Sequence, residues 1–229
     1  MINAKLLIVI ILTLSSFIVN GQRKGKSAVL KTELDSISYA MGVYNASIMK
    51  QSTIEGVNFK LYAEGFEQSY SDKEVLINAE EAASLINSYY AKERDRVAKE
   101  NLAKGKAFLE ENAKNKDVIV DESGIQYKVV KLGNGPKPLA TDKVRVHYHG
   151  TKIDGTVFDS SVQRGDPMEF LLNRVIKGWT IGLSKMNVGS KYIFYIPSEL
   201  AYGPSPRAGG AIKPNEVLIF EVELLEIIE

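Results

Sequence analysis

The sequence contains no cysteine among its 229 residues. That absence excludes a structural disulfide, a thiolate zinc site, a cysteine nucleophile and a lipid anchor on cysteine. Histidine is almost as scarce: His147 and His149 lie two apart on a predicted strand, and without a nearby third ligand they give little support for a metal site. The chain also lacks a nucleophile elbow, a phosphate-binding glycine loop and a zinc motif. Stability must therefore come from packing.

The net charge is also close to zero, because the sequence has 29 basic and 28 acidic residues. Removing residues 1–21, which contain Lys5 and no acid, makes the two numbers equal. A chain without a global field has no general attraction for nucleic acid or anionic lipid, so no nucleic-acid partner is expected. The hydrophobic share of 45% and the charged share of 25% are those of an ordinary soluble globular protein.

The amino terminus combines Lys5, an apolar run at 6–19 and small or polar residues near Gly21. This order is typical of a secretory signal peptide, and the run is too short for a comfortable membrane span. We therefore predict a cleaved signal peptide at 1–21 and a periplasmic or secreted protein. An uncleaved amino-terminal anchor is the alternative.

Helical spacing dominates the first half of the chain. Apolar residues recur at intervals of three and four over 34–48 and again over 59–66, which predicts two short amphipathic helices. Ser71 and Glu74 fit a capping box that would open a long helix extending to about Asn115. One short domain cannot readily bury this much apolar helix surface, so we expect residues 22–115 to form a homodimer.

From about residue 116 the pattern changes to short runs of alternating hydrophobicity with frequent glycine and proline. It predicts strands at 125–131, 143–148, 191–196 and 216–225, and a short helix at 174–183 laid across a curved sheet. Tyr148 faces inward on its strand, and Asp154-Gly155 turns the chain into a second strand that delivers Phe158 and Asp159. A carboxylate beside two aromatic residues in one concavity is typical of a ligand pocket, in which a few polar groups fix the orientation of the ligand.

Taken singly, the aromatic residues of this half would be assigned to the core. The order of five segments is far more specific: VHYHG at 146–150, FDSS at 158–161, VIKGW at 175–179, AYG at 201–203 and LIFEVEL at 218–224. Together they resemble the FKBP family of peptidyl-prolyl cis–trans isomerases over about residues 121–229. The upstream helices are similar to those of the two-domain, Mip-like bacterial members, whose amino-terminal helices form a dimer.

The resemblance implies an α+β fold, with a curved antiparallel sheet wrapped on a short helix at 116–229. An all-α dimerisation domain with a long linking helix would precede it at 22–115. The catalytic residues implied by the family are Tyr148, Phe158, Asp159, Ile176 and Tyr202. The implied substrate-binding residues are Arg164, Met168, Phe170, Val175, Trp179, Ile212 and Phe220. In this assignment Trp179 is the pocket floor, the Ile176 N–H and the Tyr202 hydroxyl bind substrate carbonyls, and Arg164 pairs with Asp159.

The implied activity is X-Pro isomerisation during the folding of exported proteins, with proline-containing unfolded chains as partners. Neither a metal nor an organic cofactor is expected, and macrolides are candidate inhibitors. The sequence departs from the family in two places: Met168 stands where many members have Phe, and 206–210 lacks the aromatic or imidazole side chain of some members. Both departures bear on macrolide affinity and on the preference for the residue before proline. The alternative function is a holdase chaperone or scaffold whose barrel binds proline passively.

Overall fold

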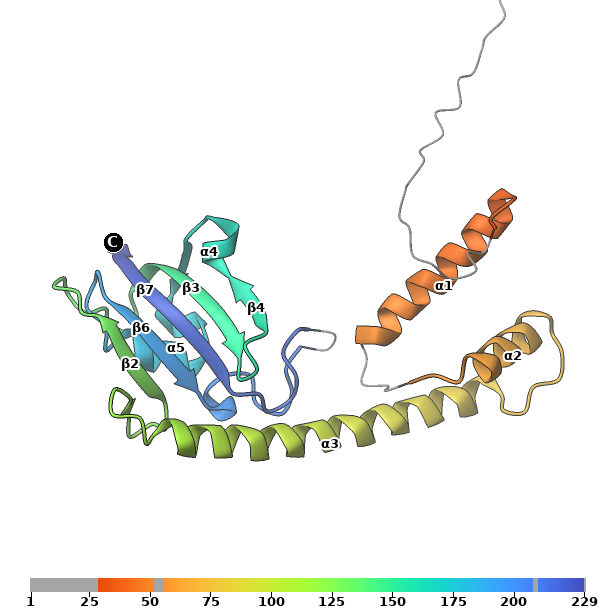
Figure 1. The fold of residues 1–229 in the computed structure, drawn as a ribbon, viewed down its shortest axis with the longest axis horizontal. Helices are drawn as coiled ribbons and strands as arrows, with labels where there is room; N and C mark the ends of the chain where they lie inside the picture. The colour runs from red at the N-terminus through yellow and green to blue at the C-terminus, as the bar shows by residue number, and fades with distance from the viewer. Residues whose placement is uncertain (1–28, 52–55, 208–209, 229) are drawn as a thin grey trace, which may run out of the picture. The chain divides into compact units, whose positions relative to one another are not determined.

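The computed structural model describes residues 29–51, 56–207 and 210–228, and Figure 1 labels their helices and strands. The chain divides into two compact units, residues 1–44 and residues 45–229. The predicted signal peptide at 1–21 lies outside the described residues. Among the helices that are described, none combines the length and the hydropathy that a membrane crossing requires.

The amino-terminal elements are helical, as the apolar spacing predicts. They are α1 (Glu33–Gln51), α2 (Phe59–Tyr70) and α3 (Ala79–Asn112). The helices predicted at 34–48 and 59–66 are thereby confirmed, and the long helix ends within a few residues of its expected end. Its predicted start is wrong.

Two similar capping patterns compete for the start of α3. Ser71 is the C-cap of α2, and Asp72 follows with a positive φ of 53°, which turns the chain away from a helical path. At the second pattern the Asn78 side chain accepts a hydrogen bond from the backbone N–H of Glu81 at 2.9 Å, and the Glu81 carboxylate accepts one from the N–H of Asn78 at 3.0 Å. This reciprocal pair is the capping box that opens the helix.

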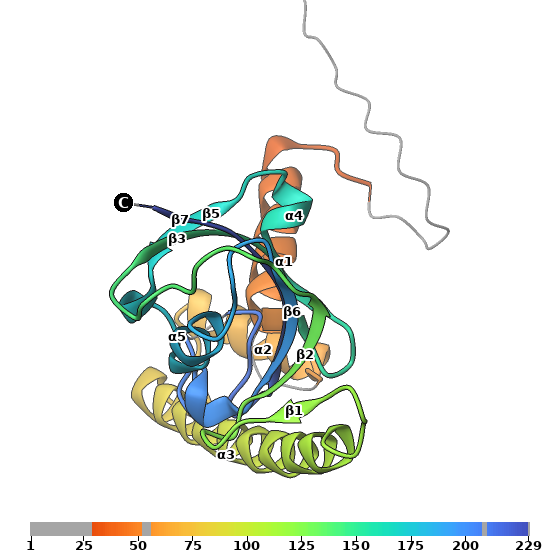
Figure 2. The same ribbon diagram turned by 90° about the vertical axis from the view of Figure 1, so that its left-hand side faces the viewer.

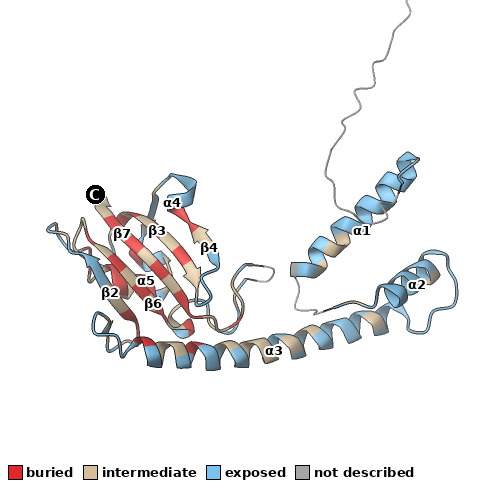
Figure 3. Ribbon diagram, viewed as in Figure 1, coloured by how far each residue is buried: buried red, intermediate tan, exposed pale blue. Residues whose placement is uncertain are grey.

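Apolar side chains on the first two helices remain open to solvent, as the pale blue colour over much of α1 and α2 in Figure 3 shows. Leu34 is 74% exposed on α1, and Phe59 is 75% exposed on α2. Single exposed apolar residues are normal, but each of these two helices carries a succession of them, so each exposes an apolar surface within the part of the chain that the structure describes.

The carboxy-terminal half forms a seven-stranded antiparallel sheet in the order β1-β2-β6-β7-β3-β4, with β5 also paired to β3. The strands are β1 (Ile119–Val120), β2 (Gln126–Lys131), β3 (Lys143–Lys152), β4 (Val157–Ser160), β5 (Met168–Leu171), β6 (Lys191–Ile196) and β7 (Leu218–Ile228). Short helical segments connect them: α4 (Ser161–Arg164), η1 (Leu172–Arg174), α5 (Lys177–Leu183) and η2 (Ser198–Leu200). All four strands predicted from alternation are present, and the α+β class is confirmed.

The sheet curves around α5, which lies in its hollow, and we call this curved sheet together with α5 the barrel (Figure 2). Two glycines allow this close approach: a Cβ on Gly178 would lie 2.4 Å from Ile196, and a Cβ on Gly182 would lie 2.7 Å from Phe194. The inward faces of the central strands alternate as predicted, and Figure 3 shows their buried residues in red. Tyr148 on β3 and Phe220 on β7 therefore point toward the same helix, which places both beside Trp179.

Candidate active site

A cavity of about 510 Å³ opens between α5, the inner face of the sheet and the segment after η2. Its lining residues are Tyr148, Phe158, Asp159, Met168, Phe170, Arg174, Val175, Ile176, Trp179, Tyr202 and Phe220. Every predicted pocket residue except Arg164 and Ile212 is in this set. Ile212 lines an adjoining hollow of about 300 Å³, which shares Phe158, Asp159 and Tyr202 with the main cavity.

Trp179 forms the aromatic floor of the cavity and is only 6% exposed. Its ring centroid lies 5.1 Å from those of Tyr148, Phe170 and Phe220, and it meets Tyr148 and Phe220 edge to face. The indole N–H is buried and has no hydrogen-bond acceptor among the described residues. Phe158 continues the aromatic lining, with its ring perpendicular to that of Phe220 at 5.4 Å. A surface of this kind excludes water from a bound side chain.

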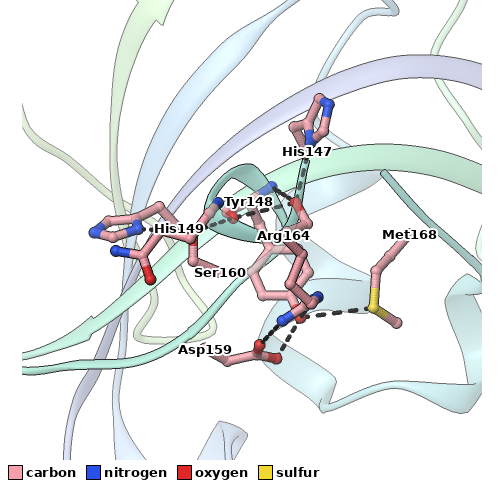
Figure 4. Close-up of polar contacts among 9 residues, drawn as sticks. His147, Tyr148, His149, Asp159, Ser160, Arg164 and Met168 are labelled. Atoms are coloured by element: carbon pink, nitrogen blue, oxygen red, sulfur yellow. Dashed lines mark hydrogen bonds and ion pairs between the residues drawn. The ribbon is translucent and has the colours of Figure 1, made fainter. Parts of the chain in front are cut away.

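One corner of the cavity is polar and is formed by Tyr148, Asp159 and Arg164; we call it the polar corner (Figure 4). The Tyr148 hydroxyl donates a hydrogen bond to the Asp159 carboxylate, and the Arg164 guanidinium pairs with the same carboxylate. Arg164 also donates to the Tyr148 hydroxyl oxygen at 3.1 Å. The sulfur of Met168 lies 3.7 Å from that hydroxyl oxygen. The predicted pairing of Arg164 with Asp159 is present, but Arg164 does not line the cavity itself, where the sequence placed it among the substrate-binding residues.

The polar corner sets the protonation states of its members. Burial opposes the charged form of Asp159, but the hydrogen bonds from Tyr148 and Arg164 outweigh it and hold the pKa of Asp159 below its usual value. Burial, supported by the bond to Asp159, raises the pKa of Tyr148. Asp159 is therefore an ionised acceptor, and Tyr148 is a neutral donor.

A short helix brings Arg164 back to Asp159. The Ser160 hydroxyl caps α4 by accepting a hydrogen bond from the Gln163 N–H at 3.2 Å, and Gly165 ends the helix with a φ of 76°. This single turn places the guanidinium over the carboxylate five positions earlier in the chain. Glycine suits the end of the turn because L side chains rarely adopt that backbone conformation.

The two histidines lie on the opposite face of β3 and support the segment that follows Asp159. The Nδ1 atom of His147 lies 3.1 Å from the Ser161 hydroxyl, and the Nδ1 atom of His149 lies 3.0 Å from the Ser160 hydroxyl. No group of three potential metal ligands occurs in the part of the chain that the structure describes.

The remaining predicted residues are placed by the segments around α5 and η2. Ile176 is the N-cap residue of α5, directly after Val175 in the cavity wall. Tyr202 is 48% exposed, and partial burial together with the Asp159 charge raises the pKa of its hydroxyl. That hydroxyl stays protonated near neutral pH and is a potential donor to a ligand. Sequence reasoning missed Arg174, which lines the cavity from η1; its position directly before Val175 was the one available clue.

Residues 135–225 match the family described as FKBP-type peptidyl-prolyl cis-trans isomerase, and residues 34–129 match the domain amino terminal to that isomerase. The chain is 44% identical to the FKBP-type peptidyl-prolyl cis-trans isomerase FkpA of Aeromonas hydrophila, across 84% of this chain and 74% of the relative. It is 37% identical to the outer membrane protein MIP of Legionella longbeachae, across 86% and 87%.

Among solved structures, the crystal structure of FkpA from Escherichia coli superposes with a TM-score of 0.63 at 35% identity, covering 87% of this chain and 98% of that chain. The two family matches cover the amino-terminal helices as well as the curved sheet. The similarity is therefore not confined to the isomerase domain. The chain therefore belongs to the FKBP-type peptidyl-prolyl cis–trans isomerases and catalyses rotation about the bond that precedes proline.

Proposed function

We propose that the cavity above Trp179 is the isomerase site, and that the twelve predicted residues carry the reaction. The observation that supports this most is the meeting of a water-excluding aromatic floor with one ionised carboxylate in a single cavity. Proline is the apolar, compact side chain that such a floor accepts. The polar corner fixes the orientation of the bound peptide in the cavity.

The reaction breaks no bond. Rotation about the X-Pro amide has a barrier of ~18–20 kcal/mol and takes tens of seconds or longer unaided. The planar amide separates charge, and water stabilises that separation, so a dry aromatic pocket favours the twisted amide. Phe158, Trp179 and Phe220 supply the dry surface. Each ~1.4 kcal/mol removed from the barrier accelerates rotation tenfold.

Polar groups in this proposal orient the peptide and do not transfer protons. Asp159 is already ionised and held by two donors, so its role is to fix Tyr148 and to polarise the pocket. Following the family resemblance, the Ile176 N–H and the Tyr202 hydroxyl bind substrate carbonyls. Met168, Phe170 and Val175 line the wall, and Ile212 contributes the outer rim.

The direct test is the turnover of a proline tetrapeptide by the purified full-length protein and by Phe158→Ala. The variant should lose at least tenfold in rate, because it removes an aromatic wall of the cavity. Leu132→Ala is the control, since Leu132 is an exposed apolar residue of the carboxy-terminal half that lies outside both the pocket and the proposed dimer arm. Full activity of Phe158→Ala would exclude this pocket, whereas catalytic turnover by the wild type already separates an isomerase from a passive proline-binding scaffold.

We also propose that residues 22–115 form a homodimeric arm and that residues 116–229 form the isomerase domain. The support is the apolar surface that α1 and α2 each expose among the described residues. Sedimentation of the full-length protein should give a dimer, and Ile37→Glu on α1 should shift it to a monomer. A monomeric wild type would contradict the arm's role and leave the isomerase assignment unchanged.

The proposed clients are proline-containing unfolded proteins outside the cytoplasm. The support is the signal pattern at 1–21, together with a relative named as an outer membrane protein. Amino-terminal sequencing of the native protein should find a mature chain that begins near Gln22. An intact Met1 in the cytoplasmic fraction would refute the export proposal.

A further inference from the structure

The linking helix α3 is hydrogen-bonded to the loop that forms the outer rim of the pocket. This rim loop leaves the barrel at Gly203 and returns at Asn215, and its described part is 203–207 and 210–215. The side-chain amide of Asn101 donates to the carbonyl oxygen of Pro214 at 2.8 Å. In return, the side-chain amide of Asn215 donates to the carbonyl oxygen of Ala98 at 3.2 Å. Each side supplies one asparagine donor and one backbone acceptor; we call this pair of bonds the asparagine clamp.

The clamp attaches at the base of the rim loop, where the loop closes on itself. The backbone N–H of Asn215 donates to the carbonyl oxygen of Gly203 at 2.9 Å. The Glu216 carboxylate accepts from the Lys213 N–H at 2.7 Å and pairs with Lys152 at 3.1 Å, with both side chains of the ion pair less than one fifth exposed. Gly203 directly follows Tyr202, so the helix is joined to the backbone next to a pocket residue.

Close packing and a second set of bonds hold α3 on the barrel beyond the clamp. A Cβ on Gly105 would lie 2.7 Å from Val217 Cγ2, so the helix backbone is in contact with this buried side chain. Near the helix end, the Asn112 amide donates to Gln126 Oε1 at 2.8 Å, and the Gln126 amide donates to the carbonyl oxygen of Leu109 at 2.9 Å. The barrel thus anchors the helix independently of the rim loop, which gives the clamp a fixed point to hold the loop against.

We propose that Asn101 and Asn215 are positioning residues for the isomerase: through them α3 holds the rim that carries Tyr202 and Ile212, and so sets the affinity for the peptide that flanks the proline. The inference rests on the proposed function of the pocket. It assigns part of the linking helix α3 a role in positioning that pocket. Both asparagines lie outside the set of residues that line the two hollows. They act through the backbone at Gly203 and Pro214.

The two sides of the pocket should respond differently when the clamp is lost. The aromatic floor is held by α5 and the sheet, and neither contains a clamp residue. The rim, in contrast, would lose the bonds that fix its base. Loosening it should therefore weaken peptide binding while the rotation step on the floor proceeds at its normal rate.

The experiment compares KM and kcat for a proline tetrapeptide in the full-length protein carrying Asn101→Ala or Asn215→Gly. Glycine accepts the positive φ of 56° at position 215, so this variant removes the side-chain bond without backbone strain. Asn87→Ala is the matched control, because it changes an exposed asparagine of the same helix to alanine outside the docked segment. We expect KM to rise roughly twofold to tenfold in both clamp variants, the range for one lost hydrogen bond, with kcat within twofold of wild type.

Three results would overturn the inference. The first is a wild-type KM in both clamp variants. The second is a parallel fall in kcat and in the unfolding midpoint with an unchanged KM, because that would show a purely structural role. The third is absence of turnover in the wild type, which would overturn the proposed function as well. An active wild type, an impaired Phe158→Ala and unaffected clamp variants would reject the clamp alone.

Discussion

Replacing Asp159 with alanine removes the acceptor on which the polar corner depends. Its carboxylate accepts from the Tyr148 hydroxyl and pairs with the Arg164 guanidinium. Tyr148 is 5% exposed, and without the carboxylate its hydroxyl keeps only the contacts to Arg164 and to the Met168 sulfur among the bonds described above. The variant therefore tests whether this corner stabilises the fold, polarises the pocket, or does both.

The magnitude follows from the exposure of the groups. The Asp159 side chain is 42% exposed and that of Arg164 is 46% exposed, so their ion pair is screened by solvent and adds little. A hydrogen bond from a buried hydroxyl to a charged acceptor contributes about 1.5–3 kcal/mol, and partial exposure of the acceptor favours the lower end. We expect a loss of ~1.5–2 kcal/mol of unfolding free energy and a midpoint lowered by roughly 5–10 °C.

The assay pairs thermal unfolding with tetrapeptide turnover well below the lowered midpoint, so that stability does not limit the measured rate. Asp159→Ala should lose about tenfold in kcat/KM, which corresponds to ~1.4 kcal/mol at the transition state. Asp159→Asn keeps an acceptor for Tyr148 but no charge, so it should recover stability more than activity. Asp166→Ala, an exposed aspartate nearby, is the control. Full activity in both Asp159 variants would refute any role for the carboxylate in catalysis.

Trp179→Ala should cost ~3–5 kcal/mol of unfolding free energy and at least tenfold in kcat/KM, whereas Trp179→Phe should retain more of both in urea unfolding and peptide assays. The rate should be flat from about pH 5 to 9, because Asp159 has a lowered pKa and Tyr148 a raised one. The stability that Asp159 contributes is complete above its unfolded pKa of about 3.9 and disappears as the pH falls through its lower folded pKa; a bell-shaped rate profile near neutrality would instead indicate proton transfer. Gly105→Leu should destabilise the protein by ~1–3 kcal/mol through overpacking against Val217, whereas Gly65→Ala, in open space on α2, should stabilise it by up to ~1 kcal/mol; equal unfolding midpoints would contradict the close contact of α3.

The sequence predicts those parts of the fold where one local pattern, such as hydrophobic alternation or a turn dipeptide, has no competing pattern nearby. Val144, Val146 and Tyr148 alternate with polar residues, and all three are buried on β3. The Asp154-Gly155 turn is also where it was expected, with Gly155 at a φ of 83°. The pocket residues were identified from the order of five segments, because no single aromatic residue can be distinguished from core by its type alone.

The features that sequence reasoning missed depend on competition or on distance along the chain. Ser71 and Asn78 both begin acceptable capping patterns, and the turn at Asp72 decides between them. The strands β1 and β5 have two and four residues, which is too short for alternation to be recognised. The bond from Asn101 to Pro214 joins residues 113 positions apart, and no periodic pattern records such a contact.

The strand order bears on the proposed role of the protein in the folding of other chains. An exposed sheet edge is a template on which an extended chain can add itself as a further strand. Here the outermost strand β1 has two residues, and the far side of β3 is shared between the four-residue strands β4 and β5, with a register shift between Gly150 and Thr151. Strand β1 covers only the first two residues of β2, which leaves 128–131 as a further edge of four residues. Each of these edges among the described residues is therefore short. On the proposed function, an extended chain bound at the pocket would find no long edge on which to add itself as an eighth strand.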